Sequence, residues 1–288
     1  MTPDGLNGRE SEKLRAAVES ILKVYTIPVI LKKVLEVVAN ERASVSDLVE
    51  VIRHDQALSS KIVATANTAF YGFRRNISSI PGAATTLGFN MVRSLAVSVS
   101  VFRCASGDLA FLRKLWQHSF ESALVSGLIA ERTGLVKKED AFLAGLIHDL
   151  GRAILYQIHG EKYLRVAVDA SEDGLSEKEA AAFGADHSRV GAWFVDKYRF
   201  PKECVLAIEH HHEPEKCDGG KTARDIASIV HLADILSLKG KEDATVDEAA
   251  EKRLAAIMES VYLDPDGLNE IREKLWEMAE MIKEFYAS

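Results

Sequence analysis

A histidine and an aspartate stand next to each other in the segment 144–151, which reads Ala-Gly-Leu-Ile-His-Asp-Leu-Gly. The neighbours His148 and Asp149 cannot share one face of a regular helix, because successive side chains point in different directions. They can still converge on one ion if the helix ends or distorts there, and Gly151 is the residue type that would allow this. A neutral imidazole with a carboxylate suits Zn, Fe, Mn or Ni, so the pair is a candidate metal site.

Two further candidate ligands are single polar residues inside apolar segments. His118 lies thirty residues before His148, and Asp234 lies in the later segment 231–236. A lone polar ligand in an apolar helix is reasonable when several helices converge, because an ion offsets the desolvation of each buried group. Alone, His118 is more often a hydrogen-bonded core histidine, so the prediction of a metal site depends on the set of four.

A second group of histidines could complete another metal position. His187 follows an aspartate, and His211 and His212 belong to the run 210–214, where a helix should end before Pro214. The alternatives are a solvated helix terminus for the run and a helix N-terminal residue without chemistry for His187.

Three other histidines have no such company. We expect His54, His159 and His231 to lie at the surface or in packing contacts, although His231, three residues before Asp234, could instead support that ligand.

The elements that must position these residues are predicted to be helices. Apolar residues recur at spacings of three and four almost everywhere, as in the segment 30–38, and strand-like alternation is nearly absent. Ser46, Pro201 and Pro265 are read as helix starts. Turns are predicted at 80–82, 133–134, 172–174 and 217–220, where glycine or proline interrupts the pattern. The fold class is therefore all-α.

Composition limits the classes of function. The chain has 288 residues and a hydrophobic content of 47%, which is typical of a globular protein. A net charge of −7 argues against a nucleic-acid polymer as partner, and no long uncharged apolar run indicates a membrane span. Cys104, Cys204 and Cys217 are too few and scattered for a disulfide framework and are expected to be free thiols. With a polar, non-signal-like start, we expect a cytoplasmic protein.

With these residues in view, the sequence resembles the HDOD family, a branch of the HD superfamily of metal-dependent phosphohydrolases, over residues 20 to 240. In the first half the resemblance rests on the segments 51–62, 66–72, 77–80 and 87–88. In the second half it rests on 142–151, 186–193 and 211–214.

The resemblance implies a multi-helical HD-like bundle with an N-terminal helical lobe and a role in bacterial signalling. We divide the chain into an N-terminal extension (1–20), the N-terminal lobe (21–106), the HD-like metal-binding lobe (107–240) and C-terminal helices (241–288). Many members have lost HD ligands and have no demonstrated catalysis, whereas this chain keeps them.

The resemblance also extends to the ligands of the HD-GYP phosphodiesterases, which cleave cyclic di-GMP. The matching positions are His118, His148, Asp149, His187, His211, His212 and Asp234. The Gly-Tyr-Pro element is missing after 218–220, and Lys114 replaces a carboxylate one turn before His118. These departures put cyclic di-GMP hydrolysis and a third metal in doubt, but not the binding of one or two divalent transition-metal ions.

Three functions remain open. The first is a regulatory module that relays a signal to a protein partner, with the metal or a nucleotide stabilising one conformation. In that function, positions around Arg74, Arg75 and Arg93 would help form the surface that contacts the partner. The alternative is that Arg74 and Arg75 only solvate a turn. The second is a metal-dependent phosphohydrolase in which Asp149 bridges two ions and Arg152 grips a phosphate, although Arg152 could be a plain surface residue. The third is a metal-free helical bundle.

Overall fold

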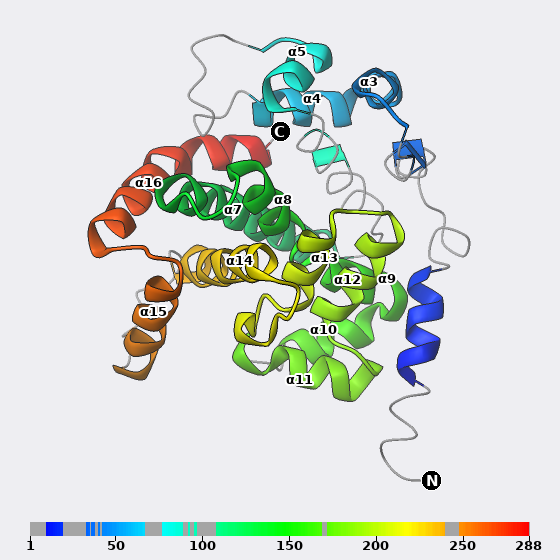
Figure 1. Ribbon diagram of the computed structural model, residues 1–288. Coiled ribbons are helices and arrows are strands. Elements are labelled where there is room, and N and C mark those ends of the chain that lie inside the picture. The colour runs from blue at the N-terminus through cyan, green and yellow to red at the C-terminus, as the bar shows by residue number, and fades with distance from the viewer. Residues whose placement is uncertain are drawn as a thin grey trace.

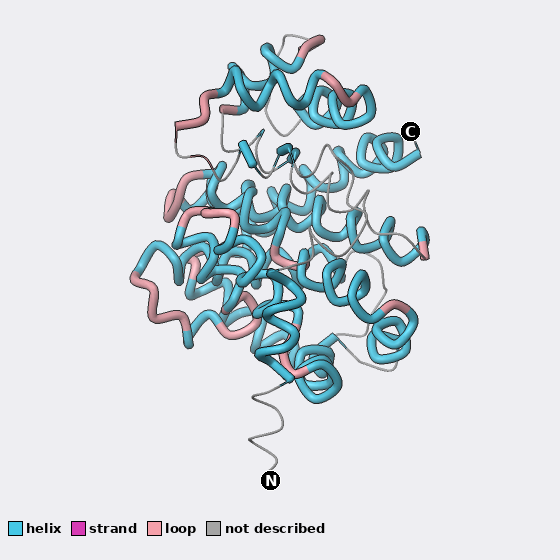
Figure 2. The backbone as a smooth tube through the Cα atoms, turned by 90° about the vertical axis from the view of Figure 1, so that its right-hand side faces the viewer, coloured by secondary structure: helices cyan, strands magenta, loops and turns pink. Residues whose placement is uncertain are grey.

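The computed structural model describes residues 10–19, 33–34, 36–37, 40, 42–66, 77–88, 92, 95–96, 108–168, 172–239 and 248–287. Every regular element in these ranges is a helix, and the helices are stacked in layers (Figures 1 and 2). The prediction of an all-α fold is therefore confirmed. Arg74, Arg75, Arg93 and Cys104 lie outside the described residues.

The first layer contains three short helices, α3 (Val45–Arg53), α4 (Gln56–Ala66) and α5 (Ile80–Leu87), which pack on one another (Figure 1). Ser44, not Ser46, caps α3, and its side chain exchanges hydrogen bonds with Asp47 in a capping box. The predicted turn at 80–82 is wrong, because Pro81 and Gly82 form the first turn of α5, where proline is well tolerated.

The central layer holds α7 (Leu109–Thr133), α8 (Lys138–Ile147) and α14 (Lys221–Lys239), with α7 packed against both of the others. Asp108 caps the start of α7, and Gly134, with φ of 65°, ends it in the left-handed conformation. Gly145 lets α8 approach α7, since a Cβ there would lie 2.9 Å from the Cα of Ala123.

The third layer is built from α9 (Leu150–His159), α10 (Glu161–Val168), α11 (Glu172–Phe183), α12 (His187–Lys197) and α13 (Lys202–Glu209). Helix α12 packs on α9, and α13 lies between α12 and α14. A short 3-10 helix, η2 (Pro214–Lys216), precedes α14. The predicted turn at 172–174 is wrong, because these residues form the first turn of α11.

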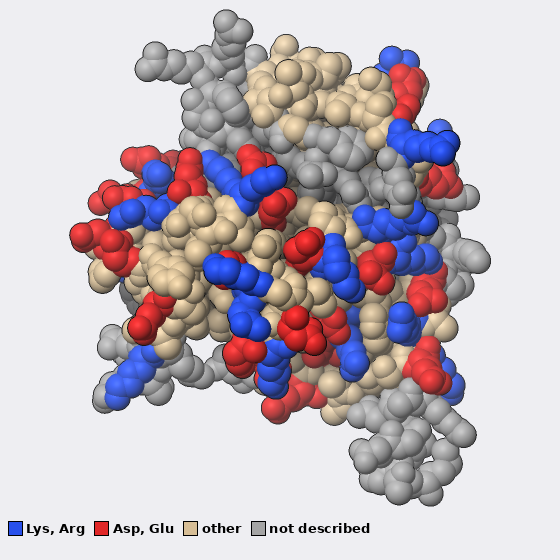
Figure 3. All heavy atoms as spheres, viewed as in Figure 1, with Lys and Arg blue, Asp and Glu red and all other residues tan. Residues whose placement is uncertain are grey.

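Two C-terminal helices complete the described chain: α15 (Glu248–Ser260) contacts α14, and α16 (Pro265–Ala287) lies along α7 (Figure 1). Cys204 and Cys217 are buried, and neither forms a disulfide within the described part of the chain. Among the described helices, none combines the length and the hydropathy that crossing a bilayer requires. Acidic and basic side chains are interspersed on the face shown in Figure 3. The division into lobes stays a prediction.

Candidate metal centre

The helices bring all seven predicted ligands into one cluster, in which every residue but the half-buried His212 is buried. Its members come from the middle of α7 (His118), the α8–α9 junction (His148 and Asp149), the start of α12 (His187), the turn after α13 (His211 and His212) and α14 (Asp234). They form two groups, one around His118, His148 and Asp149 and one around His187, His211 and His212. That these residues hold a metal stays a prediction.

The chain distorts at the His-Asp pair. Helix α8 ends at Ile147, His148 keeps a right-handed helical conformation, and Asp149 leaves it with φ of −94° and ψ of 9° before α9 begins. The expected break is present, but the role expected for Gly151 is wrong. Gly151 lies inside the first turn of α9, where a Cβ would come within 2.7 Å of the carbonyl carbon of His187. Glycine is required here for the close crossing of α9 and α12.

In the first group, ligand atoms surround a single point. The Nε2 atom of His118 lies 3.3 Å from Nε2 of His148 and 3.0 Å from Oδ1 of Asp234. The same Asp234 oxygen is 3.7 Å from His148 Nε2, and Asp149 Oδ2 is 3.7 Å from His118 Nε2. Two imidazoles and two carboxylates with convergent lone pairs form a donor set for a divalent transition metal.

The second group is composed mainly of imidazoles. Nε2 of His187 is 2.9 Å from Nε2 of His212, and the rings of His211 and His212 have centroids 3.9 Å apart. Nε2 of His211 is buried without a hydrogen-bond partner. Asp149 connects the groups, because its other oxygen, Oδ1, is 3.4 Å from Nε2 of His187.

The Nδ1 atoms explain why the Nε2 atoms face inward. Nδ1 of His148 lies 2.8 Å from the Gly145 carbonyl oxygen, and Nδ1 of His211 lies 2.7 Å from that of Ile208. A carbonyl oxygen can only accept, so each Nδ1 carries a proton, and Nε2 is the nitrogen whose lone pair can bind an ion when the ring is neutral. The residues present therefore fit metal binding, with an orphaned lone pair on His211 and pairs of nitrogens within 3.3 Å.

His118 and His187 are held by side chains. Ser237 donates its hydroxyl to the Asp234 carbonyl, so its oxygen can accept from Nδ1 of His118 at 3.3 Å. Nδ1 of His187 lies 2.6 Å from Oε2 of Glu179.

Charge differs between the groups. Burial alone would lower the pKa of His148, but the carboxylates of Asp149 and Asp234 outweigh it and raise that pKa to about 9. Burial together with the neighbouring His187 lowers the pKa of His212 to about 4, and burial and His212 hold the pKa of His211 well below its usual value. The first group therefore attracts a positive charge, whereas the second presents two neutral imidazoles ready to act as ligands.

Arg152 is directed toward the ligands instead of the surface. Its Nη1 donates to Asp149 Oδ2 at 2.9 Å. Contact with a phosphate stays a prediction for this residue. His54 is exposed near Glu50, and His159 stacks on Phe183 with centroids 4.3 Å apart, in agreement with the surface and packing roles expected for them.

Sequence reasoning missed Glu179, Tyr163 and Ser237, which hold the ligands or their neighbours. Glu179 is fully buried on α11, whereas Glu177 of the same helix is exposed, and the local sequence does not distinguish them. The eight-residue spacing between Glu179 and His187 indicates their contact only when the chain is known to turn back between α11 and α12.

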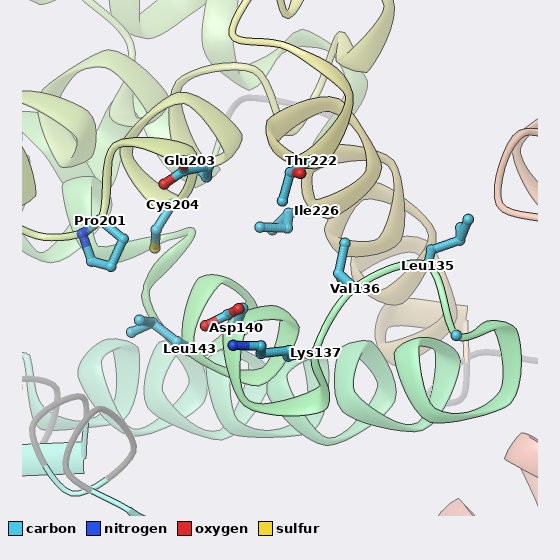
Figure 4. A pocket seen from close by; sticks show the side chains of 11 residues that line it. Leu135, Val136, Lys137, Asp140, Leu143, Pro201, Glu203, Cys204, Thr222 and Ile226 are labelled. Carbon is cyan, nitrogen blue, oxygen red and sulfur yellow. The ribbon is translucent and has the colours of Figure 1, made fainter.

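A separate cavity of about 570 Å³ lies at the N-terminal ends of α8, α13 and α14 (Figure 4). Its lining includes Lys137, Asp140, Glu203, Thr222 and Ile226. None of the predicted site residues lines it. The cavity and the cluster therefore occupy different positions along the same helices.

Comparison with known proteins places these features in context. The model of the HDOD domain matches residues 24–214. An uncharacterised protein of Treponema pallidum (strain Nichols) is 22% identical over 209 residues, which are 70% of this chain and 40% of that protein. Ribonuclease Y of Geotalea uraniireducens (strain Rf4) is 30% identical over 128 residues, 44% of this chain and 19% of the relative. The chain thus spans less than half the length of either relative.

Solved structures share the fold. A candidate phosphohydrolase from Shewanella amazonensis SB2B superposes with a TM-score of 0.67 at 22% identity, covering 94% of this chain and 97% of its own. An HDOD domain protein of unknown function from Geobacter sulfurreducens gives 0.62 at 23%, covering 96% and 97%. A candidate signal transduction protein from Marinobacter aquaeolei VT8 gives 0.66 at 21%, covering 98% and 66%.

Proposed function

Because the chain belongs to the HDOD family, we propose that it is a signal-transduction protein whose HD site binds two divalent transition-metal ions, and that these ions stabilise the conformation presented to a protein partner. His118, His148, Asp149 and Asp234 would hold the first ion. His187, His211 and His212 would hold the second, with Asp149 shared between them.

The position of Asp149 carries the proposal. Its carboxylate reaches both groups: Oδ2 lies 3.7 Å from Nε2 of His118, and Oδ1 lies 3.8 Å from Nε2 of His148 and 3.4 Å from Nε2 of His187. A carboxylate in this position can bridge two ions, as in two-metal centres, where the ions are about 3.5–4 Å apart. The shared ligand would connect α7, α8 and α14 on one side with α12 and α13 on the other.

Burial favours a regulatory role for the ions over an open catalytic one. His148 and His211 are 0% exposed, His118 and Asp234 are 6% and 9% exposed, and His212 alone among the seven is half-buried. A catalytic metal needs a position open to water and substrate, whereas a structural one is enclosed by its ligands. An enclosed site acts on conformation, because an ion that binds only the ordered arrangement of the helices stabilises it by mass action.

Elemental analysis of protein purified without a histidine tag tests the metal claim. We expect two ions per chain in the wild type, loss of the first with His148→Ala, and no change with His54→Ala, since His54 is exposed and remote from the cluster. Wild-type protein without metal at neutral pH would remove the claim.

The conformational claim needs a second measurement. At an ion concentration one hundred times the Kd, each bound ion should stabilise the fold by about 2.7 kcal/mol, a rise of roughly 5–11 °C in Tm per ion for a chain of this size. Chelation should also increase hydrogen exchange over residues 187–212. Identical exchange in the loaded and chelated proteins would contradict a regulatory role.

A second candidate is a metal-dependent phosphohydrolase, favoured by the bridging position of Asp149 with Arg152 beside it. Bound ions would lower the pKa of a water molecule and neutralise charge on a phosphoester, with a nucleotide as one substrate class. A screen of cyclic dinucleotides and generic phosphoesters with Mn²⁺ or Fe²⁺ tests it. Turnover that His148→Ala abolishes would establish the enzyme, and inactivity with retained metal supports the regulatory function.

A further inference from the structure

We infer that Glu179, a residue outside the predicted ligand set, is the positioning residue of the second metal position: it fixes the ring of His187 and thereby sets the affinity of that position alone. The inference rests on the proposed two-ion site and identifies what controls one half of it.

Glu179 makes three hydrogen bonds in a fully buried site. Oε2 accepts from the backbone N–H of His187 at 2.8 Å and from its Nδ1 at 2.6 Å, and Oε1 accepts from the Tyr163 hydroxyl at 2.8 Å. The side chain is 0% exposed. An ionised carboxylate is tolerated there because these donors replace its water, and three donors to one carboxylate also hold it in a single orientation.

The bond to Nδ1 decides which nitrogen of His187 can bind an ion. A carboxylate accepts a hydrogen bond from Nδ1–H, so in the neutral ring the lone pair is on Nε2. That atom is the one 2.9 Å from His212 and 3.4 Å from Asp149. Glu179 therefore aims the lone pair at the second position and excludes the tautomer that could not bind there.

The Nδ1 atom of His187 has a different kind of hydrogen-bond partner from the Nδ1 atoms of His148 and His211. His148 and His211 are held by carbonyl oxygens three residues earlier, which helix geometry supplies automatically. His187 is the first residue of α12, so no helical residue precedes it to offer such a carbonyl. A carboxylate from α11 fills this role and, being charged, makes the imidazole a stronger ligand.

Tyr163 is the third donor to this carboxylate, whereas Asp149 is held by a different residue. Arg152, whose side chain is partly exposed, donates to Asp149 Oδ2 at 2.9 Å. Glu179 therefore acts directly on His187, and Asp149 has a support of its own. The first position has its own support for His118 in Ser237, so a change at Glu179 should leave it intact.

Glu179→Gln tests the inference, because it keeps the size of the side chain and removes its charge. The matched control is Glu177→Gln, the same change at an exposed position of the same helix. Each full-length protein, freed of metal, would be titrated with Co²⁺ while visible absorption and calorimetry report the ions separately. Melting of the metal-free proteins would report any general structural damage.

We expect Glu179→Gln to bind the first Co²⁺ as the wild type does and the second roughly 10- to 100-fold more weakly, the usual effect of losing a partner behind a ligand. Glu177→Gln should match the wild type. If Glu179→Gln fails to fold, Tyr163→Phe provides the same comparison with a smaller loss at the second position.

The possible failures are distinguishable. Equal weakening of both ions, or no weakening, in Glu179→Gln would overturn the inference while the two-ion function stands. A wild type that binds no Co²⁺ would overturn the proposed function and this inference with it.

Discussion

Replacing Gly151 with alanine tests the close crossing on which the position of His187 depends. A Cβ at Gly151 would lie 2.7 Å from the carbonyl carbon of His187 and 2.8 Å from the backbone nitrogen of Gly191, and closer still to the His187 carbonyl oxygen. All three atoms belong to the backbone of α12, so no change of rotamer can remove the clash. Helices α9 and α12 must separate, and His187 must move away from Asp149 and His212.

The expected loss of stability follows from two opposing effects. Overpacking of this kind costs about 3 kcal/mol, at the upper end of the usual range because the neighbours are rigid. Alanine recovers about 1 kcal/mol over glycine inside a helix. A net loss of about 2 kcal/mol corresponds to a fall in Tm of roughly 4–8 °C for a chain of this size. The displacement should also weaken the second ion, since its ligands must converge.

The control is Gly191→Ala, on the opposite side of the same crossing. There the nearest atoms to a Cβ would be the Gly151 nitrogen at 3.3 Å and a methyl carbon of Ile208 at 3.4 Å, which small shifts accommodate. Circular-dichroism melting and elemental analysis of both variants give the comparison. A Gly151→Ala protein that melts with the wild type and keeps both ions would contradict this prediction, as would equal damage in the two variants.

Three further predictions concern the same cluster. Binding of the first ion must displace the proton of His148, whose pKa is raised to about 9, so the apparent affinity for that ion should rise up to about tenfold per pH unit and level off only near pH 9. Calorimetry in buffers of different ionisation enthalpy should detect about one proton released when the first ion binds. An affinity that stays constant between about pH 6 and 8 would contradict this prediction. Ser237→Ala should weaken the first ion roughly tenfold and spare the second, because it removes the partner of His118; equal loss of both ions in the Co²⁺ titration would count against it. Hydrolysis of cyclic di-GMP should be weak or absent, because a displacement of about 1 Å can cost about a hundredfold in rate and the Gly-Tyr-Pro element is missing; efficient turnover that depends on His148 would show this to be wrong.

The convergence of the ligands could be predicted because their chemical types contrast with their surroundings. His118 and Asp234 are polar residues in apolar helices, and His148 with Asp149 ends one. Such residues have few ways to be buried without a partner or an ion. Their order along the chain also resembles a known pattern, and the family model matches residues 24–214, a range that contains His118, His148 and Asp149 but not Asp234.

The supporting residues could not be predicted because their roles depend on tertiary contacts. Glu179 differs from Glu177 in its tertiary contacts, because its side chain faces His187 of α12 and the hydroxyl of Tyr163. The sequence suggests that Gly151 acts through its own backbone freedom. In the structure Gly151 is helical, and a glycine is needed because the backbone of α12 packs directly against it.

Errors in the helix ends have a local cause. Proline and glycine mark a boundary, but the same residues suit a turn and the first turn of a helix. The segments 80–82 and 172–174 begin helices α5 and α11 for this reason. At α3 the cap was placed two residues late, since Ser44 and Ser46 both precede the same apolar run.

The packing of the imidazoles indicates which state of the cluster is the stable one. Without an ion, Nε2 of His211 is a buried acceptor with no partner, and Nε2 of His187 and His212 must share one proton across 2.9 Å. Each unsatisfied buried group costs about 1–3 kcal/mol, a substantial part of the 5–15 kcal/mol that holds a typical domain folded. The chain nevertheless supplies Glu179 and two backbone carbonyls to hold these lone pairs inward instead of letting the rings turn toward other partners. An arrangement that is costly without an ion supports the proposal that the metal-bound form is the functional one. Under that proposal, α12 and α13 can rearrange in the ion-free form.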